Sequence, residues 1–137
     1  MPQSIPSEPD SGQPGAATIL VVEDEVLIRL MISEYLRTFG YKVVEAKCAA
    51  EARRILWSDE LVEVVFSDVR MPGDMNGLGL AQWIGRNKPG VGVVLTSAYV
   101  SAADLADQAA PGTEVVAKPY APREVLDRIR ATIGNAN

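Results

Sequence analysis

Five polar side chains that are far apart in the sequence each lie where an apolar, strand-like run ends. They are two adjacent acids, a third acid, a threonine and a lysine: Glu23, Asp24, Asp68, Thr96 and Lys118. Because the carboxyl ends of parallel strands form the ligand-binding edge of an open α/β sheet, we expect these side chains to share one crevice. Carboxylates, a hydroxyl and a lysine are the groups needed for Mg²⁺-assisted transfer of a phosphoryl group onto a carboxylate.

Each of these residues also has an ordinary structural explanation. Asp68 suits a turn after a strand, and Glu23 and Asp24 suit a first helical turn, where the helix dipole favours acids. Thr96 and Lys118 would be unremarkable as a strand residue and a solvated surface charge. Three carboxylates in one crevice would repel one another strongly, and Mg²⁺ removes that conflict while keeping water or phosphate oxygens as its other ligands. The joint occurrence at strand ends therefore favours the chemical interpretation.

The elements that would position these residues alternate between two kinds. From Thr18 onward, short Val/Ile/Leu runs alternate with segments of helical period, which is typical of βα units and a parallel sheet. The predicted strands span residues 18–22, 41–46, 61–67, 91–96 and 113–117. The predicted helices span residues 25–39, 49–57, 77–87, 102–109 and 122–133. The predicted fold class is therefore α/β, with five parallel strands and five helices.

The first predicted helix has a clear apolar face. Helical spacing brings six side chains to that face: Ile28, Met31, Ile32, Tyr35, Leu36 and Phe39. Arg29, Ser33 and Arg37 are predicted to lie on the opposite side. Leu27 and Leu30 fall away from the apolar face, so we expect both to be exposed; single exposed leucines are common in folded proteins.

Composition excludes several classes of function. A chain of 137 residues with 47% apolar and 23% charged residues is predicted to form one soluble domain with a proper core. The single cysteine excludes an intramolecular disulfide, and the absence of histidine excludes a Ser-His-Asp triad and a phosphohistidine within this chain. The net charge of −5 argues against nonspecific nucleic-acid binding. Without a secretory signal or a membrane-spanning run, we expect a cytoplasmic protein with a flexible tail at residues 1–17.

Four stretches together resemble the receiver (CheY-like) domain of two-component response regulators. They are ILVVEDE at 19–25, FSDVRMPG at 66–73, VLTSA at 94–98 and AKPY at 117–120. The resemblance covers residues 18–133 and implies a flavodoxin-like, doubly wound sheet with strand order 2-1-3-4-5, followed by a short tail at 134–137. It also implies a cis peptide bond between Lys118 and Pro119.

The resemblance assigns a role to each site residue. Asp68 would be the phosphoacceptor, Thr96 the switch hydroxyl and Lys118 the lysine that pairs with the phosphoryl group. Mg²⁺ would be bound by Glu23, Asp24, Asp68 and the main-chain carbonyl of Arg70. The domain would accept its phosphoryl group from a histidine kinase or a histidine phosphotransfer protein and then change its contacts with a downstream protein. It would assist its own phosphorylation and dephosphorylation without being an enzyme in the usual sense.

The resemblance also bears on partners. In receivers the first helix helps to dock the phosphohistidine donor, so Leu27 and Leu30 are candidates for that contact. We expect a stand-alone receiver that is a monomer or a phosphorylation-dependent dimer and binds neither nucleic acid nor membrane. Two alternatives stay open, namely a receiver-like binding module regulated without phosphorylation and a receiver fragment of a longer regulator.

The sequence departs from the family at positions that affect signalling. Receivers often carry an aromatic residue three positions before the lysine, where this chain has Val115, so Tyr99 or Tyr120 would have to replace it in part. Arg70 and Ala98 offer no acid or amide to position a hydrolytic water, which predicts slow self-dephosphorylation. A phosphatase of the haloacid-dehalogenase type needs an acid where Arg70 lies, and a flavodoxin needs a hydroxyl- and Gly-rich loop after the first strand. Both are therefore excluded.

Overall fold

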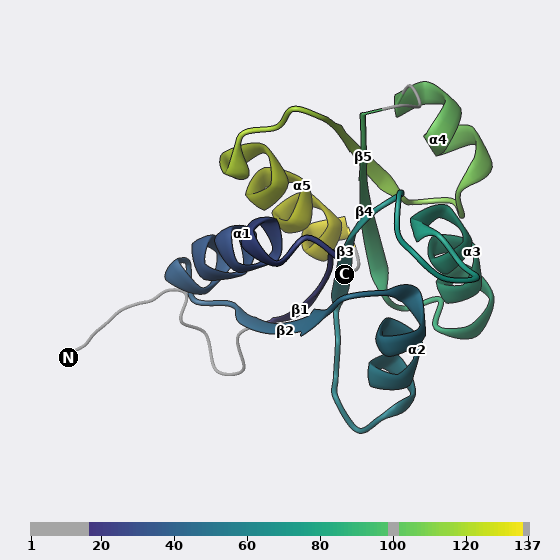
Figure 1. The fold of residues 1–137 in the computed structure, drawn as a ribbon, viewed down its shortest axis with the longest axis horizontal. Coiled ribbons are helices and arrows are strands. Elements are labelled where there is room, and N and C mark those ends of the chain that lie inside the picture. The colour runs from purple at the N-terminus through teal and green to yellow at the C-terminus, as the bar shows by residue number, and fades with distance from the viewer. Residues whose placement is uncertain (1–16, 99–101, 136–137) are drawn as a thin grey trace.

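The computed structural model describes residues 17–98 and 102–135, in which strands and helices alternate strictly (Figure 1). The strands are β1 (Thr18–Val22), β2 (Lys42–Ala46), β3 (Val64–Asp68), β4 (Gly92–Ser97) and β5 (Glu114–Ala117). The helices are α1 (Val26–Thr38), α2 (Ala49–Trp57), α3 (Gly77–Asn87), α4 (Ala102–Gln108) and α5 (Pro122–Asn135). All ten predicted elements are thus confirmed in type. Residues 1–16 and 136–137, which hold most of the two predicted tails, lie outside the described residues.

The five strands form one parallel sheet in the order β2-β1-β3-β4-β5. This is the flavodoxin-like order that the resemblance implied. Every residue of β1 and β3 is buried, because both strands lie inside the sheet and helices cover its two faces. The order brings the carboxyl ends of β1, β3, β4 and β5 together at one edge, where the predicted site residues follow or end the strands.

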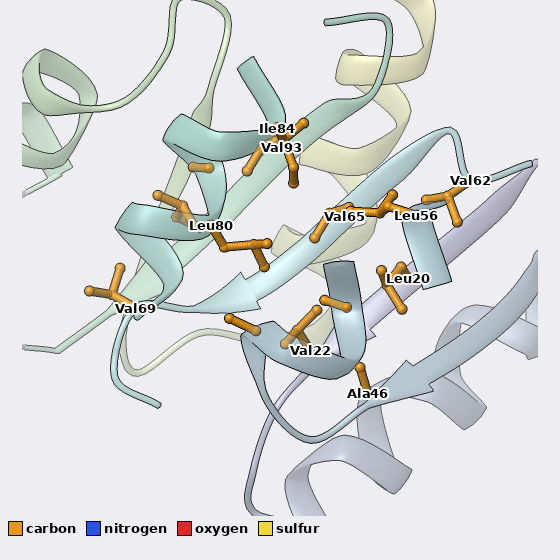
Figure 2. Packing of buried hydrophobic residues seen from close by; sticks show 14 of the residues in the cluster. Leu20, Val22, Ala46, Leu56, Val62, Val65, Val69, Leu80, Ile84 and Val93 are labelled. Carbon is orange, nitrogen blue, oxygen red and sulfur yellow. The ribbon is translucent and has the colours of Figure 1, made fainter. Parts of the chain in front are cut away.

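The helices form one layer on each face of the sheet (Figure 1). On one face α2, α3 and α4 pack on alternate strand residues, among them Leu20, Val65 and Leu95. Figure 2 shows part of this cluster, with Leu56 of α2 and Leu80 and Ile84 of α3 directed at the strands. On the other face α1 and α5 cover a second cluster, with members Ile19, Val21, Ile32, Leu36, Phe66, Val94, Val116, Leu126 and Ile129.

The buried side of α1 differs from the predicted one. Ile32 and Leu36 are buried as predicted, but Ser33 is also fully buried and Met31 is 51% exposed. The prediction for Ser33 and Met31 was wrong because α1 contacts α5 as well as the sheet, which turns its buried strip toward Ser33. Leu27 is 81% exposed and Leu30 is also exposed, as predicted.

The start of β3 also differs from its prediction. The apolar run at 61–67 predicted a strand from its first residue, but Leu61 is exposed and the Val62 amide donates to the carbonyl of Glu60 at 3.2 Å, which forms a turn. The strand therefore begins at Val64. Within residues 17–98 and 102–135, no helix has the length and apolar character needed to cross a membrane.

Candidate functional site

A crevice of about 760 Å³ opens at the carboxyl-terminal edge of the sheet. Its walls come from the turn after β1, the end of β3 with the loop that follows it, and the segments after β4 and β5. The residues that line it are Asp24, Glu25, Asp68, Val69, Arg70, Met71, Pro72, Asn76, Ala98 and Lys118. Glu23 and Thr96 are buried beside it, with 4% and 1% of their surface exposed. The strand order therefore gathers the predicted site residues in one place.

Asp68 is the last residue of β3 and is only 6% exposed. Its Oδ2 accepts a hydrogen bond from Lys118 Nζ at 2.5 Å, and its Oδ1 accepts one from the Arg70 amide at 3.0 Å. The amide of Val69, the residue directly after Asp68, donates to the carbonyl of Thr96 in β4 at 3.0 Å. Both carboxylate oxygens are thus engaged, one by a cation and one by the main chain, so the side chain has a defined orientation at the edge of the crevice.

Lys118 follows β5, and its peptide bond to Pro119 is cis, as the resemblance implied. Burial acts to lower the pKa of this lysine, but the hydrogen bond with Asp68 and the negative charges of Asp68, Glu23 and Glu25 outweigh it, so the pKa is raised. The ammonium group therefore stays charged at neutral pH and offsets part of the negative charge of the crevice.

Glu23 is held by the main chain on both sides. Its amide donates to the carbonyl of Ala46 in β2 at 3.0 Å, and its Oε2 accepts the Glu25 amide at 3.0 Å. Burial raises the pKa of Glu23 to about 7, supported by the charge of Asp68 and a hydrogen bond with Asp24, while the Glu25 amide and the Lys118 charge act in the opposite direction. Glu23 therefore keeps its proton to a higher pH than an exposed glutamate does, mainly because it is buried.

Thr96 lies beside Asp68 in the register of β3 and β4. Paired residues of neighbouring strands present their side chains on the same face of a sheet, so the hydroxyl and the carboxylate share a face. The Thr96 hydroxyl has no hydrogen-bond partner within the described part of the chain. A buried polar group without a partner costs about 1–3 kcal/mol, which a ligand oxygen arriving at Thr96 would recover in part.

Tyr120 lies on the same side as Phe66, whose ring it meets edge-on with centroids 5.9 Å apart. Burial, followed by the charges of Glu23 and Asp68, raises the pKa of Tyr120 to about 12. Val115 instead packs with the cluster under α2, α3 and α4. Tyr99, the other aromatic residue considered from the sequence, lies outside the described residues.

Sequence reasoning missed Arg29, which supports the turn after β1. Arg29 was predicted on the solvent side, yet its guanidinium donates to the Glu23 carbonyl at 2.8 Å and to Glu45 Oε1 of β2 at 3.2 Å. No local pattern indicated this, because one acceptor lies in the turn after β1 and the other, Glu45, lies in β2, 16 residues away from Arg29. Arg29 thereby ties the segment that carries Glu23 and Asp24 to the neighbouring strand.

Sequence reasoning also missed why α3 begins at Gly77. The Gly77 amide donates to the Val69 carbonyl at 2.8 Å, and a Cβ at this position would overlap the main chain of Asp68 and Val69. Asn76 caps the helix, because its side chain accepts the Gly79 amide at 2.8 Å. The Asn-Gly pair marks a turn in the sequence, but only the packing shows that glycine is required for close approach to Asp68.

The donor groups of the crevice fit Mg²⁺. Among the described residues, no three Cys, Asp or Glu side chains lie close enough to bind one metal ion together. Mg²⁺ does not need such a cage, since it takes one or two carboxylates and completes its shell with water or phosphate oxygens. Asp24 and Asp68 both line the crevice. Burial, followed by the charge of Asp68, raises the pKa of Glu23, and a nearby divalent cation would favour its ionised form.

Comparisons with known proteins bear on the family and the fold of this chain. Residues 19–130 match the family model of the response regulator receiver domain. The chain is 34% identical over 120 residues to the probable transcriptional regulator ycf27 of Guillardia theta, and the aligned region covers 87% of this chain and 46% of ycf27. It is 35% identical over 127 residues to the probable transcriptional regulatory protein TcrX of Mycobacterium tuberculosis, and the aligned region covers 89% of this chain and 51% of TcrX. The chain thus spans about half the length of these curated relatives.

The fold has close counterparts among solved structures. The crystal structure of a response regulator receiver protein from Sinorhizobium medicae superposes with a TM-score of 0.81 and covers 89% of this chain and 98% of that one. Its sequence is 22% identical, so this likeness bears on the fold alone.

Proposed function

This chain belongs to the response regulator receiver domain family, and from this premise we propose that Asp68 accepts a phosphoryl group from a phosphohistidine of a partner protein, with Mg²⁺ bound in the same crevice. The observation that carries the proposal is the environment of Asp68. A buried carboxylate is oriented by Lys118 at 2.5 Å and by the Arg70 amide at 3.0 Å. Beside it lie two further acids and the Thr96 hydroxyl, which is buried and has no hydrogen-bond partner among the described residues. This chain has no histidine of its own, so the donor is a histidine kinase or a histidine phosphotransfer protein.

In the proposed reaction one Asp68 oxygen attacks phosphorus, the phosphorus–nitrogen bond of the donor breaks, and the imidazole leaves. Lys118 then shares its charge with a phosphoryl oxygen, while the Thr96 hydroxyl donates to another. The product is an acyl phosphate, and attack of water on its phosphorus releases inorganic phosphate and returns the free carboxylate. The domain thus acts as a phosphoacceptor that assists both steps, and the change at Asp68 switches its contacts with a downstream protein.

The metal would be held by the carboxylates of Asp24 and Asp68 and by the main-chain carbonyl of Arg70, with Glu23 completing the acidic set. When bound, Mg²⁺ would neutralise charge that develops on the transferred phosphoryl group. The buried carboxyl group of Glu23 supports binding of a cation, because burial and the charge of Asp68 raise its pKa and a cation would favour its ionised form.

The principal test is labelling by acetyl phosphate in the presence of Mg²⁺, measured by intact-protein mass spectrometry. We expect wild type to gain one phosphoryl group, and chelation with EDTA to prevent this. Asp68→Asn should not be labelled, whereas Asp74→Asn, which removes an exposed acid of the following loop, should be labelled normally. Labelling of Asp68→Asn at the wild-type level would overturn the assignment.

The alternative of a binding module regulated without phosphorylation is less well supported. Such a module has no need of an aligned carboxylate, lysine and hydroxyl, yet Asp68, Lys118 and Thr96 are all present with the arrangement described above.

We also propose that the phosphohistidine donor contacts the start of α1. Val26, Leu27, Leu30 and Met31 are all exposed there, directly after the acids that line the crevice. Leu27→Glu combined with Leu30→Glu should slow transfer from a cognate phosphohistidine donor but leave labelling by acetyl phosphate intact. Leu61→Glu, which changes an equally exposed leucine at the opposite edge of the sheet, is the matched control and should affect neither rate. An equal loss of both rates in the double variant would contradict this contact.

A further inference from the structure

The two tryptophans of this chain lie together on the surface formed by α2 and α3. Trp57, the last residue of α2, is 61% exposed, and Trp83 of α3 meets it edge-on with ring centroids 5.5 Å apart. The Lys88 ammonium lies 4.8 Å from the centroid of the Trp57 ring. A side chain as large and as exposed as Trp57 adds little to the core, so its position is not explained by folding alone.

Three basic residues lie close to this aromatic pair in the sequence or in space. Arg54 precedes Trp57 by three residues and Arg86 follows Trp83 by three, and residues at this spacing share a helix face. Within the described residues, Arg54, Arg86 and Lys88 have no carboxylate at ion-pair distance, and neither does Arg130 of α5, whereas eight other cations do. We call these five residues (Arg54, Trp57, Trp83, Arg86 and Lys88) the tryptophan patch.

Structural roles account for only part of the patch. Arg54 and Arg86 lie in the last turns of their helices, where cations interact favourably with the helix dipole. The dipole does not explain why an exposed tryptophan lies between them. It also does not explain why, in the part of the chain that the structure describes, no carboxylate pairs with these three cations although the net charge is −5. Tryptophan and arginine are the residues most enriched among those that dominate binding energy at protein interfaces.

The patch is remote from the crevice. Both helices start at the carboxyl edge of the sheet and run back from it, side by side on one face (Figure 1), so Trp57 and Lys88 lie toward the opposite edge. A partner bound to the patch would leave Asp68 and its ligands accessible.

We propose that the tryptophan patch docks an acidic amphipathic segment of a partner protein. Aliphatic or aromatic side chains of the segment pack on the rings of Trp57 and Trp83, and its carboxylates pair with Arg54, Arg86 and Lys88. Charge complementarity selects an acidic segment over a basic or neutral one. Nucleic acid fits less well, because its binding depends on neutralising a series of phosphates, which three cations on an acidic protein do not provide. Docking at this patch is independent of phosphorylation.

Intrinsic fluorescence tests the proposal directly, because both tryptophans of the chain belong to the patch. The probe is a synthetic helical peptide with leucines at helical spacing and glutamate elsewhere. We expect a saturable change in emission that weakens as salt is added. Arg54→Glu combined with Arg86→Glu should raise the Kd of this peptide by about tenfold or more. Arg123→Glu combined with Arg130→Glu, which reverses two exposed cations on α5, is the charge-matched control and should leave the Kd unchanged.

Three comparison probes decide what the patch binds. A peptide with lysine in place of glutamate, a peptide with serine in place of leucine, and a single-stranded DNA oligonucleotide should each bind at least about tenfold more weakly. No saturable change with the Glu/Leu peptide, or equal affinity for the Lys/Leu peptide, would overturn the proposal. Preferred binding of the oligonucleotide that is lost in the Arg54 and Arg86 variant would replace it with a nucleic-acid surface.

A variant at the centre of the patch separates binding from folding. Because Trp57 is exposed, Trp57→Ala should keep the wild-type circular dichroism spectrum and nearly the wild-type urea midpoint. It should nevertheless lose most of its affinity for the Glu/Leu peptide in calorimetric titration. Undiminished affinity in a folded Trp57→Ala protein would contradict the proposal.

Discussion

Replacing Glu23 by glutamine should stabilise the metal-free protein above pH 7. The Glu23 side chain is 4% exposed, and burial followed by the charge of Asp68 raises its pKa from 4.5 to about 7. Folding therefore carries a free-energy cost whenever this carboxyl group is ionised. Glutamine removes the charge but keeps an oxygen that accepts the Glu25 amide, which Glu23 Oε2 accepts at 3.0 Å. The substitution thus isolates the effect of charge from the effect of the hydrogen bond.

The size and the pH window follow from the pKa shift. One pKa unit corresponds to about 1.4 kcal/mol, so a shift from 4.5 to about 7 amounts to roughly 3 kcal/mol. Below the unfolded pKa both states hold the proton and the cost is absent. Between the two pKa values the unfolded chain binds fewer protons than the folded one, so stability falls as pH rises. Above the folded pKa the cost is complete, and Glu23→Gln should then gain about 2–3 kcal/mol.

Urea unfolding in EDTA, followed by circular dichroism at about pH 5 and about pH 8, measures this difference. Glu63→Gln, which changes an exposed glutamate ahead of β3, is the control and should alter stability by less than about 0.5 kcal/mol at either pH. Added Mg²⁺ should reduce the difference in the free energy of unfolding between wild type and Glu23→Gln at the higher pH, because a cation stabilises the ionised carboxylate. A gap that is equal at both pH values, or a less stable Glu23→Gln protein at the higher pH, would refute the reasoning.

Three further predictions concern residues around the crevice. Gly77→Ala should destabilise the protein by about 1–3 kcal/mol in urea unfolding and reduce labelling by acetyl phosphate, because its Cβ would overlap the main chain of Asp68. Arg29→Ala should cost about 1–2 kcal/mol and weaken Mg²⁺ binding in calorimetric titration, since it removes the bond to the Glu23 carbonyl. Burial raises the pKa of Tyr120 from 10.0 to about 12. In a titration of tyrosinate absorbance, one tyrosine should therefore ionise near pH 12, and this late ionisation should be absent from Tyr120→Phe. The free energy of unfolding should fall between pH 10 and 12, because in that range the unfolded chain loses the Tyr120 proton and the folded protein keeps it.

Each of these predictions has a matched control. Gly90→Ala adds a Cβ with no atom within 4 Å and should change stability by less than about 0.5 kcal/mol. Arg123→Ala removes an exposed pair with Asp127 and should cost less than about 1 kcal/mol, without effect on Mg²⁺ binding. Tyr35→Phe should keep the late titration near pH 12 that Tyr120 causes. Equal effects of a variant and its control would contradict the corresponding prediction.

The local pattern of apolar residues was enough to predict the strands and helices, because short apolar runs and apolar residues at helical spacing follow directly from which side chains are buried. It was also enough to bring Asp68, Thr96 and Lys118 to one edge, because position at a strand end follows from the element boundaries. Local pattern could not predict contacts made across the fold. The burial of Ser33 depends on α5, and the support of the β1 turn by Arg29 depends on β2. Such contacts leave no periodic trace in the sequence.

The two faces of the sheet give a physical account of how a signal could leave the crevice without an aromatic residue at position 115. Thr96 is in register with Asp68 and with Val116, so its side chain belongs to the face covered by α1 and α5. Val115 belongs to the opposite face. Tyr120 packs on the α1–α5 face, where its pKa already responds to the charges of Glu23 and Asp68. If Thr96 moves toward a phosphoryl oxygen, we expect the edge-on contact between Phe66 and Tyr120 on the same face to change. The tyrosine signal in near-ultraviolet circular dichroism should therefore change when beryllofluoride and Mg²⁺ bind to wild type at neutral pH, and this change should be absent from Tyr120→Phe. An unchanged signal in wild type would refute this route.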